Sequence, residues 1–182
     1  MQVAELTAHR DAMVALNVEY LSWVYAGIEA HFGVSADHVN GVPVADYVPG
    51  VIDKVCGHSP PNGIFYLLRD GDAVNGLTSV TPNQPWVGMG GLRGLGGGVA
   101  EIKRLYLRPG YRGRGWAAGL LKRLLADAKA FGYRSVCLDS APFMSDAQRL
   151  YLAHGFADCS AYDAVEVPAE FRHQWRYMAR PL

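Results

Sequence analysis

Residues 100–117 read AEIKRLYLRPGYRGRGWA, and this stretch decides how the rest of the chain is interpreted. Its first part, 100–107, is predicted to be a strand that ends at Pro109-Gly110. Its second part, 112–117, alternates arginine with glycine directly before an apolar stretch that is predicted to be helical. The sequence therefore predicts a strand, a glycine-rich turn and the start of a helix in immediate succession.

The predicted turn has the chemistry of an anion-binding site. Glycines at positions 113 and 115 let backbone N–H groups converge without obstruction by side chains. The helix that follows adds the unpaired N–H groups of its first turn and the positive end of its dipole. Arg112 and Arg114 add positive charge. The expected ligand is therefore a phosphate or a pyrophosphate.

Two other phosphate-binding motifs compete for this turn. A P-loop needs Gly-Lys-Ser/Thr after the glycines, and the sequence does not have it. A dinucleotide site fits in part, because Gly113 and Gly115 are followed by Gly119, and Asp139 ends the next predicted strand. However, residues 108–112 separate the strand from the first glycine, and the remaining chain is short for a doubly wound sheet. A dinucleotide-binding oxidoreductase is thus a distant alternative.

Composition and charge narrow the class of protein. The chain has 182 residues, half of them hydrophobic, which is enough for the core of a single domain. Seventeen basic residues balance seventeen acidic ones, so neither a nucleic-acid partner nor a membrane surface is expected. The balance is uneven, because 101–135 holds nine bases against two acids and 1–60 holds seven acids against two bases. An acidic N-terminal part mildly favours a cationic amine as substrate.

Three widely spaced cysteines, Cys56, Cys137 and Cys159, form no C-x-x-C pair, and no H-E-x-x-H motif occurs. This pattern predicts reduced thiols, a cytoplasmic protein and no metal. No stretch approaches 18 uninterrupted apolar residues, and the first residues lack the apolar core of a signal peptide. We therefore expect neither a membrane span nor export.

Periodicity predicts a mixed order of helices and strands around the turn. Helices are expected at 7–32, 49–56, 115–131 and 145–154, with 33–50 mostly a loop. Strands are expected at 64–68, 86–93, 100–107 and 135–140, and 71–85 receives no assignment. The tail is expected to supply two more strands from the apolar residues around 156, 165–167 and 175–179. Strands that alternate with helices after a hairpin indicate a mixed α/β sheet.

Two motifs in this order resemble the GNAT family of N-acetyltransferases. Residues 112–117 match the phosphate loop Q/R-x-x-G-x-G/A, and residues 147–156, AQRLYLAHGF, resemble the signature A-x-x-L-Y-x-x-x-G-F. The resemblance is specific from about residue 86 to 157. It implies an α/β (α+β) fold with a mixed, mostly antiparallel central sheet and helices on both faces. The fourth and fifth strands, 100–107 and 135–140, would be parallel and splayed apart.

The resemblance also implies the cofactor and how it is held. Acetyl-CoA is the expected co-substrate, and no metal takes part. In the family the pyrophosphate lies on the loop and the pantetheine arm pairs with the preceding strand. The positions carried over are Arg112, Gly113, Arg114, Gly115, Trp116 and Ala117 for the loop, and Leu105, Tyr106 and Leu107 for the strand. Met144 stands where many members have an asparagine, so no cofactor hydrogen bond is carried over to that position.

Two residues are candidates for catalysis. Glu101 is the candidate general base, because the base of the family's histone acetyltransferases precedes its loop by the same eleven residues. A salt bridge from Glu101 to Lys103 or Arg104 is the alternative. Tyr151 is the candidate general acid, since a phenol has a pKa of about 10, comparable to that of the leaving thiol. The family places the matching tyrosine beside the coenzyme sulfur.

Candidate acceptor contacts are Arg93, Tyr20 and Tyr162. Arg93 could clamp a carboxylate, and a surface arginine is the alternative. Tyr20 lies in the helix that faces the family's acceptor groove, where a core position is the alternative. Tyr162 belongs to the last loop near the acceptor.

The expected protein is a single N-acetyltransferase domain over 1–182, with 1–60 on the acceptor side and 61–182 forming the sheet and the acetyl-CoA core. It would acetylate a primary amine of a small molecule or amino acid by direct attack on the thioester. A protein or peptide N-acetyltransferase would instead need an open acidic groove, whereas a small-molecule enzyme would have a closed pocket built partly from 33–60. A non-catalytic coenzyme-A-binding module is a further alternative. Homodimers are common in the family, so a homodimer is an open alternative to a monomer.

Overall fold

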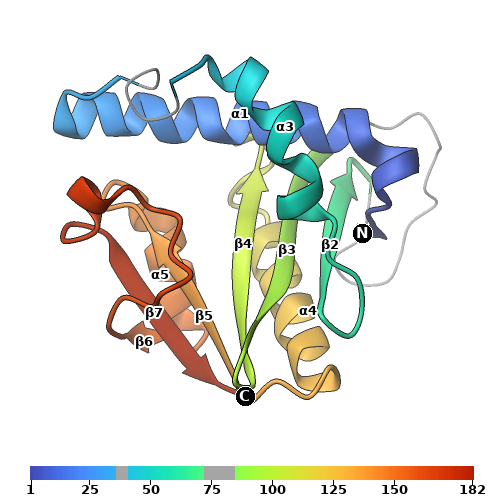
Figure 1. Ribbon diagram of the computed structural model, residues 1–182. Coiled ribbons are helices and arrows are strands. Elements are labelled where there is room, and N and C mark those ends of the chain that lie inside the picture. Colours follow the sequence, from blue (N-terminus) through green and yellow to red (C-terminus); the bar gives the residue numbers. More distant parts are fainter. Residues whose placement is uncertain (36–40, 72–84) are drawn as a thin grey trace.

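The computed structural model describes residues 1–35, 41–71 and 85–182. These residues form a seven-stranded sheet in the order β1-β2-β3-β4-β5-β7-β6, which Figure 1 shows with its flanking helices. The strands are β1 (Gln2–Val3), β2 (Gly63–Arg69), β3 (Trp86–Gly96), β4 (Val99–Leu107), β5 (Ser135–Ser140), β6 (Ala157–Asp158) and β7 (Arg176–Pro181). Only β4 and β5 pair in parallel among the strands described. The predicted mixed, mostly antiparallel fold is confirmed, and a doubly wound parallel sheet is excluded.

Helices cover both faces of the sheet. They are α1 (Leu6–Phe32), α3 (Val44–Cys56), α4 (Trp116–Ala130) and α5 (Ser145–Ala153), with short 3₁₀ turns η1 (Pro109–Tyr111) and η2 (Ala169–Phe171). Residues Ile64, Tyr66 and Leu68 of β2 pack in the core on the α4 side, and the alternate residues pack against α1 and α3. A strand that is apolar on both faces is typical of a sheet buried between helices.

Helix α3 begins earlier than the sequence predicted, so the expected loop over 33–50 is wrong from residue 44 onward. Four apolar residues recur along one face of α3 and are buried: Val44, Val48, Ile52 and Val55. Burial of this stripe outweighs the loss of one backbone hydrogen bond at Pro49, which lies inside the helix. Residues 36–40 of the expected loop, and 72–84 of the unassigned stretch, lie outside the described residues.

The C-terminal segment differs from the prediction in one place. Val165 and Val167 are buried against α1, but 165–167 is not a strand. Arg172 donates side-chain hydrogen bonds to the carbonyl oxygens of Val167 (2.9 Å) and Val165 (3.5 Å). Side-chain donors thus bind carbonyls that a neighbouring strand would otherwise bind, which holds this segment over α1 without sheet pairing.

A β-bulge interrupts the pairing of β3 with β4. Met89 faces Tyr106 and Gly91 faces Lys103, so Arg104 and Leu105 together oppose the single residue Gly90. Arg104 has φ = 57°, in the left-handed region that a non-glycine residue rarely adopts. The extra residue changes which face each following side chain occupies. As a result the side chain of Arg104 points toward α1. The central carbon of its guanidinium, Cζ, lies 5.4 Å from the ring centre of Tyr20.

Strands β4 and β5 pair over only three residue pairs. Val99, Ala100 and Glu101 face Ser135, Val136 and Cys137, and beyond Cys137 the two strands diverge toward α1 (Figure 1). The predicted splaying of these strands is therefore confirmed. Backbone groups of β4 beyond Glu101 have no β5 partner, which leaves them available to a guest.

Close packing of the sheet at Gly91 yields a stability prediction. A Cβ atom at Gly91 would lie 2.3 Å from Cδ2 of the buried Phe65, so alanine there forces the ring to move. We expect Gly91→Ala to lower the free energy of unfolding by about 1–3 kcal/mol in urea titrations. Gly50→Ala is the matched control, because Gly50 lies in α3 with no atom near the added Cβ. It should raise that free energy by about 0.5–1 kcal/mol. A Gly91→Ala protein as stable as the wild type would contradict the packing described.

Candidate active site

The divergence of β4 and β5 opens a cavity of about 460 Å³. Its walls come from α1, β4, the turn before α4, and α5. Nine of the predicted cofactor and catalytic residues line it, namely Leu105, Tyr106, Leu107, Arg112, Gly113, Gly115, Trp116, Ala117 and Tyr151. The structure thus brings the predicted strand, turn and tyrosine together around one space that is large enough for an extended ligand.

Backbone N–H groups at the turn are unpaired. Gly113 and Gly115 have φ of 74° and 80°, a left-handed conformation that glycine adopts without strain. No carbonyl in the part of the chain that the structure describes accepts a hydrogen bond from the N–H groups of residues 113–118. The N–H of Arg112 differs, because it donates to the carbonyl of Pro109 at 3.2 Å. The donors available to an anion therefore begin at Gly113.

The two arginines of the turn occupy different surroundings. Arg112 lines the cavity, donates from Nε to the carbonyl of Leu107 at 3.0 Å, and lies over the ring of Trp23 at 5.3 Å. Arg114 is exposed, and its guanidinium lies 5.6 Å from the ring centre of Tyr111. Arg112 therefore contributes its charge directly to the cavity, while Arg114 contributes charge from the surface beside it.

Tyr151 projects from α5 into this space. It is buried, at 6% exposed, and its ring packs on Phe156 with 5.8 Å between ring centres. Burial, the phenol of Tyr20 and the carboxylate of Asp139 all raise the pKa of Tyr151 above its usual value. Its hydroxyl stays protonated at neutral pH, as an ordinary phenol does, and the raised pKa makes it a weaker acid than the phenol with a pKa of about 10 used in the sequence prediction.

A second cavity of about 320 Å³ adjoins the first. It lies between α1 and the C-terminal segment, and Tyr47 of α3 adds to its wall. Five residues line both cavities: Tyr20, Ile102, Arg104, Asp139 and Met144. Burial raises the pKa of Tyr20 to about 12, although the positive charge of Arg104 acts in the opposite direction. Of the three predicted acceptor contacts, only Tyr20 lines this cavity.

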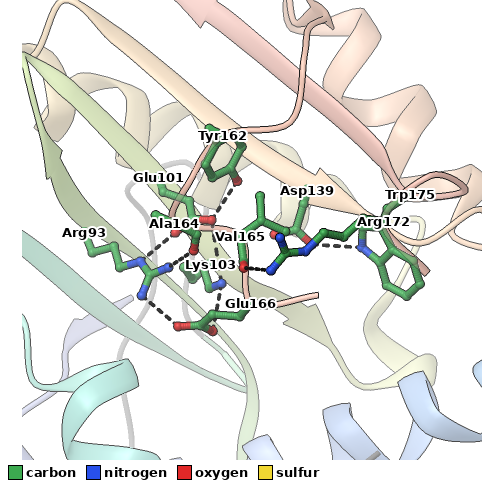
Figure 2. A network of polar contacts seen from close by, with 10 residues as sticks. All are labelled: Arg93, Glu101, Lys103, Asp139, Tyr162, Ala164, Val165, Glu166, Arg172 and Trp175. Carbon is green, nitrogen blue, oxygen red and sulfur yellow. Dashed lines mark hydrogen bonds and ion pairs between the residues drawn. The ribbon is translucent and has the colours of Figure 1, made fainter. Parts of the chain in front are cut away.

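Asp139 occupies the junction of the two cavities. Cys137 is the last β5 residue that pairs with β4, and Asp139 lies two residues after it. The side chains of Cys137 and Asp139 are therefore on the same face of the strand. Its carboxylate accepts a hydrogen bond from Nε1 of Trp175 at 3.0 Å, as Figure 2 shows. From the sequence, Asp139 is a candidate only for a dinucleotide site. Its place two residues beyond the point of divergence is the signal that could have identified it.

Glu101 is enclosed by partners within the protein. Its side chain is fully buried and accepts hydrogen bonds from Nε of Arg93 (2.6 Å) and the hydroxyl of Tyr162 (2.7 Å), and Nζ of Lys103 lies 3.6 Å away (Figure 2). Among the described residues that line the two cavities, Glu101 is not found. The geometry therefore favours the ion-pair alternative for Glu101 over the role of base.

Arg93 and Tyr162 belong to the same network and likewise lie outside the described linings of both cavities. Arg93 also binds Glu166 (2.8 Å) and the carbonyl of Ala164 (3.1 Å). Burial opposes ionisation of Glu166, but Lys103 and Arg93 outweigh it and lower the pKa of Glu166 to about 2. The network thus ties the C-terminal segment to β3 and β4, and this segment forms a wall of the second cavity.

Residues 1–35, 41–71 and 85–182 contain neither a metal site nor a membrane-spanning helix. No group of three histidine, cysteine or acidic side chains could hold a metal ion there. No helix in the same ranges has the length and hydropathy needed to cross a membrane.

Comparison with known proteins agrees with this architecture. Residues 38–156 match the model of the acetyltransferase (GNAT) family. The chain is 33% identical over 114 residues to the uncharacterized N-acetyltransferase C1271.07c of Schizosaccharomyces pombe, a match that covers 61% of this chain and 62% of that protein. It is 26% identical over 130 residues to the uncharacterized N-acetyltransferase YjgM of Escherichia coli, covering 71% of this chain and 70% of that one.

A solved structure shares the fold over its whole length. The PaiA N-acetyltransferase from Thermoplasma acidophilum, in complex with coenzyme A, has a TM-score of 0.66 and 17% identity, and each chain is covered completely. At that identity the likeness concerns the fold alone. Because the family model spans well over half of the sequence, the chain belongs to the acetyltransferase (GNAT) family of acyltransferases.

Proposed function

We propose that the protein transfers the acetyl group of acetyl-CoA to a primary amine of a small molecule or amino acid. One observation carries the proposal: a cavity that ends at unpaired backbone N–H groups adjoins a second cavity, and Asp139 lines both while Tyr151 lines the first. Membership of the family supports the use of acetyl-CoA. A cytoplasmic location and a homodimer stay predictions.

The residues of the first cavity fit coenzyme A. Its pyrophosphate would accept hydrogen bonds from the N–H groups of residues 113–118, next to the positive charge of Arg112. Its pantetheine amides would bond to the backbone of Leu105, Tyr106 and Leu107, which β5 leaves unpaired. The N–H groups of residues 113–118 have no acceptor among the described residues, and the edge of β4 beyond Glu101 has no β5 partner; this fit is the reason to assign the cavity to the coenzyme.

Amide formation from a thioester needs a neutral amine. The amine nitrogen attacks the carbonyl carbon, a C–N bond forms, and the carbonyl oxygen becomes an oxyanion that a backbone N–H of β4 can stabilise. An alkylammonium has a pKa of about 10, so it must lose a proton first. We assign the receipt of that proton to Asp139 rather than Glu101. Asp139 is half-buried and lines both cavities, whereas Glu101 is sealed within its ion-pair network.

Collapse of the tetrahedral intermediate breaks the C–S bond and releases a thiolate. Tyr151 can protonate that thiolate, because its hydroxyl is held in the protonated form and it lines the coenzyme cavity. A coenzyme-binding module without catalysis does not require a protonated hydroxyl in the coenzyme cavity, although the ring of Tyr151 also packs in the core. The position of Tyr151 therefore favours an enzyme.

The size of the acceptor cavity supports a small-molecule substrate. Its volume of about 320 Å³ suits a molecule of amino-acid size. Tyr47 contributes to its wall from the region 33–60, as the small-molecule alternative requires, and Glu166 and Pro168 contribute from the C-terminal segment. Glu166 is the acidic side chain that the C-terminal segment contributes to the wall, and it is paired with Lys103 and Arg93. The described wall therefore does not form the open acidic groove expected for basic peptides.

Release of free thiol from acetyl-CoA tests the proposed function. We expect turnover with amines of amino-acid size in a colorimetric thiol assay, with kcat/KM at least about tenfold above that for lysine-containing peptides, because the cavity limits access. Mass spectrometry of the product should show the added acetyl group on nitrogen. Tight binding of acetyl-CoA without turnover of any amine would instead support the non-catalytic module.

Tyr151→Phe tests the proton donor. Loss of the hydroxyl should lower kcat by about 10²-fold or more, while KM for acetyl-CoA and the melting temperature change little, since the ring still packs on Phe156. Tyr133→Phe is the matched control, because its hydroxyl binds the carbonyl of Asn62 (3.1 Å), away from both cavities. Equal kcat values for the wild type and Tyr151→Phe would remove Tyr151 from the mechanism.

A further inference from the structure

The acceptor cavity contains a cation that no described residue pairs with. Lys103 and Arg104 both line this cavity, but only Lys103 is paired, with Glu166 at 3.0 Å and Glu101 at 3.6 Å. Within residues 1–35, 41–71 and 85–182, no carboxylate forms an ion pair with Arg104 and no acceptor takes a hydrogen bond from it. The one described interaction of its positive charge is a cation–π contact with the ring of Tyr20, at 5.4 Å.

Keeping Arg104 in this state costs stability twice. Its Nε is buried without a hydrogen-bond partner, which costs about 1–3 kcal/mol for an ordinary polar group and more for a charged one. Its backbone has φ = 57°, and a left-handed conformation costs a non-glycine residue about 1–2 kcal/mol. Two such costs at one residue of a cavity wall indicate that Arg104 is kept for function rather than for stability. Arg104 lines both cavities, and the terminal nitrogens of its guanidinium are the donors left for a ligand.

The opposite charge at the junction belongs to Asp139. It also lines both cavities, and its one described hydrogen bond comes from Trp175 (3.0 Å). Asp139 and Arg104 are not ion-paired with each other. The cavity therefore presents a separate carboxylate and a separate guanidinium, which is the charge pattern that complements a zwitterion.

Apart from Lys103 and Glu166, which are paired with each other, the remaining wall is apolar and aromatic. Tyr25, Val24, Ile28 and Tyr47 line the space together with Trp175. Such a wall suits a hydrophobic or aromatic side chain, and the volume of about 320 Å³ limits the guest to one residue of that kind.

We propose that the acceptor is a free amino acid, or a closely related aminocarboxylate with an apolar or aromatic body, and that Arg104 is the residue that selects it by binding the carboxylate. The inference rests on the proposed function of the same site. The amine lies toward Asp139, and the terminal N–H groups of Arg104 bind the carboxylate oxygens as a fork. A peptide or protein N-terminus carries an amide in place of that carboxylate, so the site rejects it.

Three sets of amines test this assignment. Aromatic and branched L-amino acids are offered as free acids, as amides and as the amines that lack the carboxylate, each with acetyl-CoA. We expect kcat/KM for the best free acid to exceed that for its amide by about 10²-fold or more, because the amide leaves Arg104 unpaired. Amides or simple amines that are acetylated as well as the free acids would overturn the assignment and leave the proposed function intact.

Arg104→Met then tests the residue itself. It should lower kcat/KM for the free acid by about 10²-fold while changing the value for the matching simple amine by less than about threefold, and Arg104→Lys should recover part of the loss. Arg134→Met is the control, because Arg134 is exposed and binds the carbonyl of Gly97 far from the cavities. A melting temperature no lower than that of the wild type and a retained Kd for coenzyme A establish that each variant is folded, and Arg104→Met should melt somewhat higher because it removes the buried unpaired guanidinium. A loss that is equal for acid and amine would contradict a role in carboxylate recognition.

A binding measurement separates the two proposals. Calorimetric titration of the free acid into the coenzyme-A complex should give binding that Arg104→Met abolishes, even in the absence of turnover. If no amine of any kind is acetylated but this binding is seen, the proposed function fails and the carboxylate site stands. If the wild-type complex binds the free acids no better than their amides, the carboxylate site fails.

Discussion

Backbone pairing between β4 and β5 stops after three residue pairs, and the whole site depends on this interruption. Each further pair would satisfy backbone groups that the structure instead leaves open toward α1. The open edge is maintained because packing on both faces fixes the two strands, with α4 and α5 on one side and α1 on the other. Figure 1 shows how the strands converge at one end and diverge at the other. Leaving backbone groups of β4 unpaired costs free energy, and burial of apolar side chains elsewhere offsets that cost. A ligand in the cavity can form the missing hydrogen bonds.

Two further features give this opening its chemistry. The bulge opposite Gly90 turns Arg104 toward α1, and the ion-pair network around Glu101 holds the C-terminal segment over the same space (Figure 2). The network joins residues from β3, β4 and the segment before η2, so it fixes one wall of the acceptor cavity relative to the sheet. Glu101 thus contributes through its position in a buried network of ion pairs, where removal of a charged partner would leave an uncompensated charge.

The sequence predicted those parts of the site that local patterns determine. The turn at 112–117 and Tyr151 were identifiable because glycine spacing and a short motif carry the information, and the structure brings both to one cavity. Arg104 and Asp139 were not, because their exposure to the cavities depends on a bulge and on where pairing ends, and both are set by contacts between strands. The surroundings of Glu101 were out of reach for the same reason, since Tyr162 is 61 residues away in the chain. The start of α3 is not predicted because Pro43 and Pro49 favour a loop, although the buried stripe of the helix decides the outcome.

Backbone amide shifts during titration with coenzyme A measure the central claim most directly. In ¹H–¹⁵N spectra of the labelled protein, the amides of residues 113–118 should shift strongly on addition of coenzyme A and much less on addition of pantetheine, which lacks the pyrophosphate. Amides of 105–107 should respond to both ligands. A response to coenzyme A that leaves 113–118 unchanged would contradict the account, because the coenzyme would then bind somewhere other than the opening between β4 and β5.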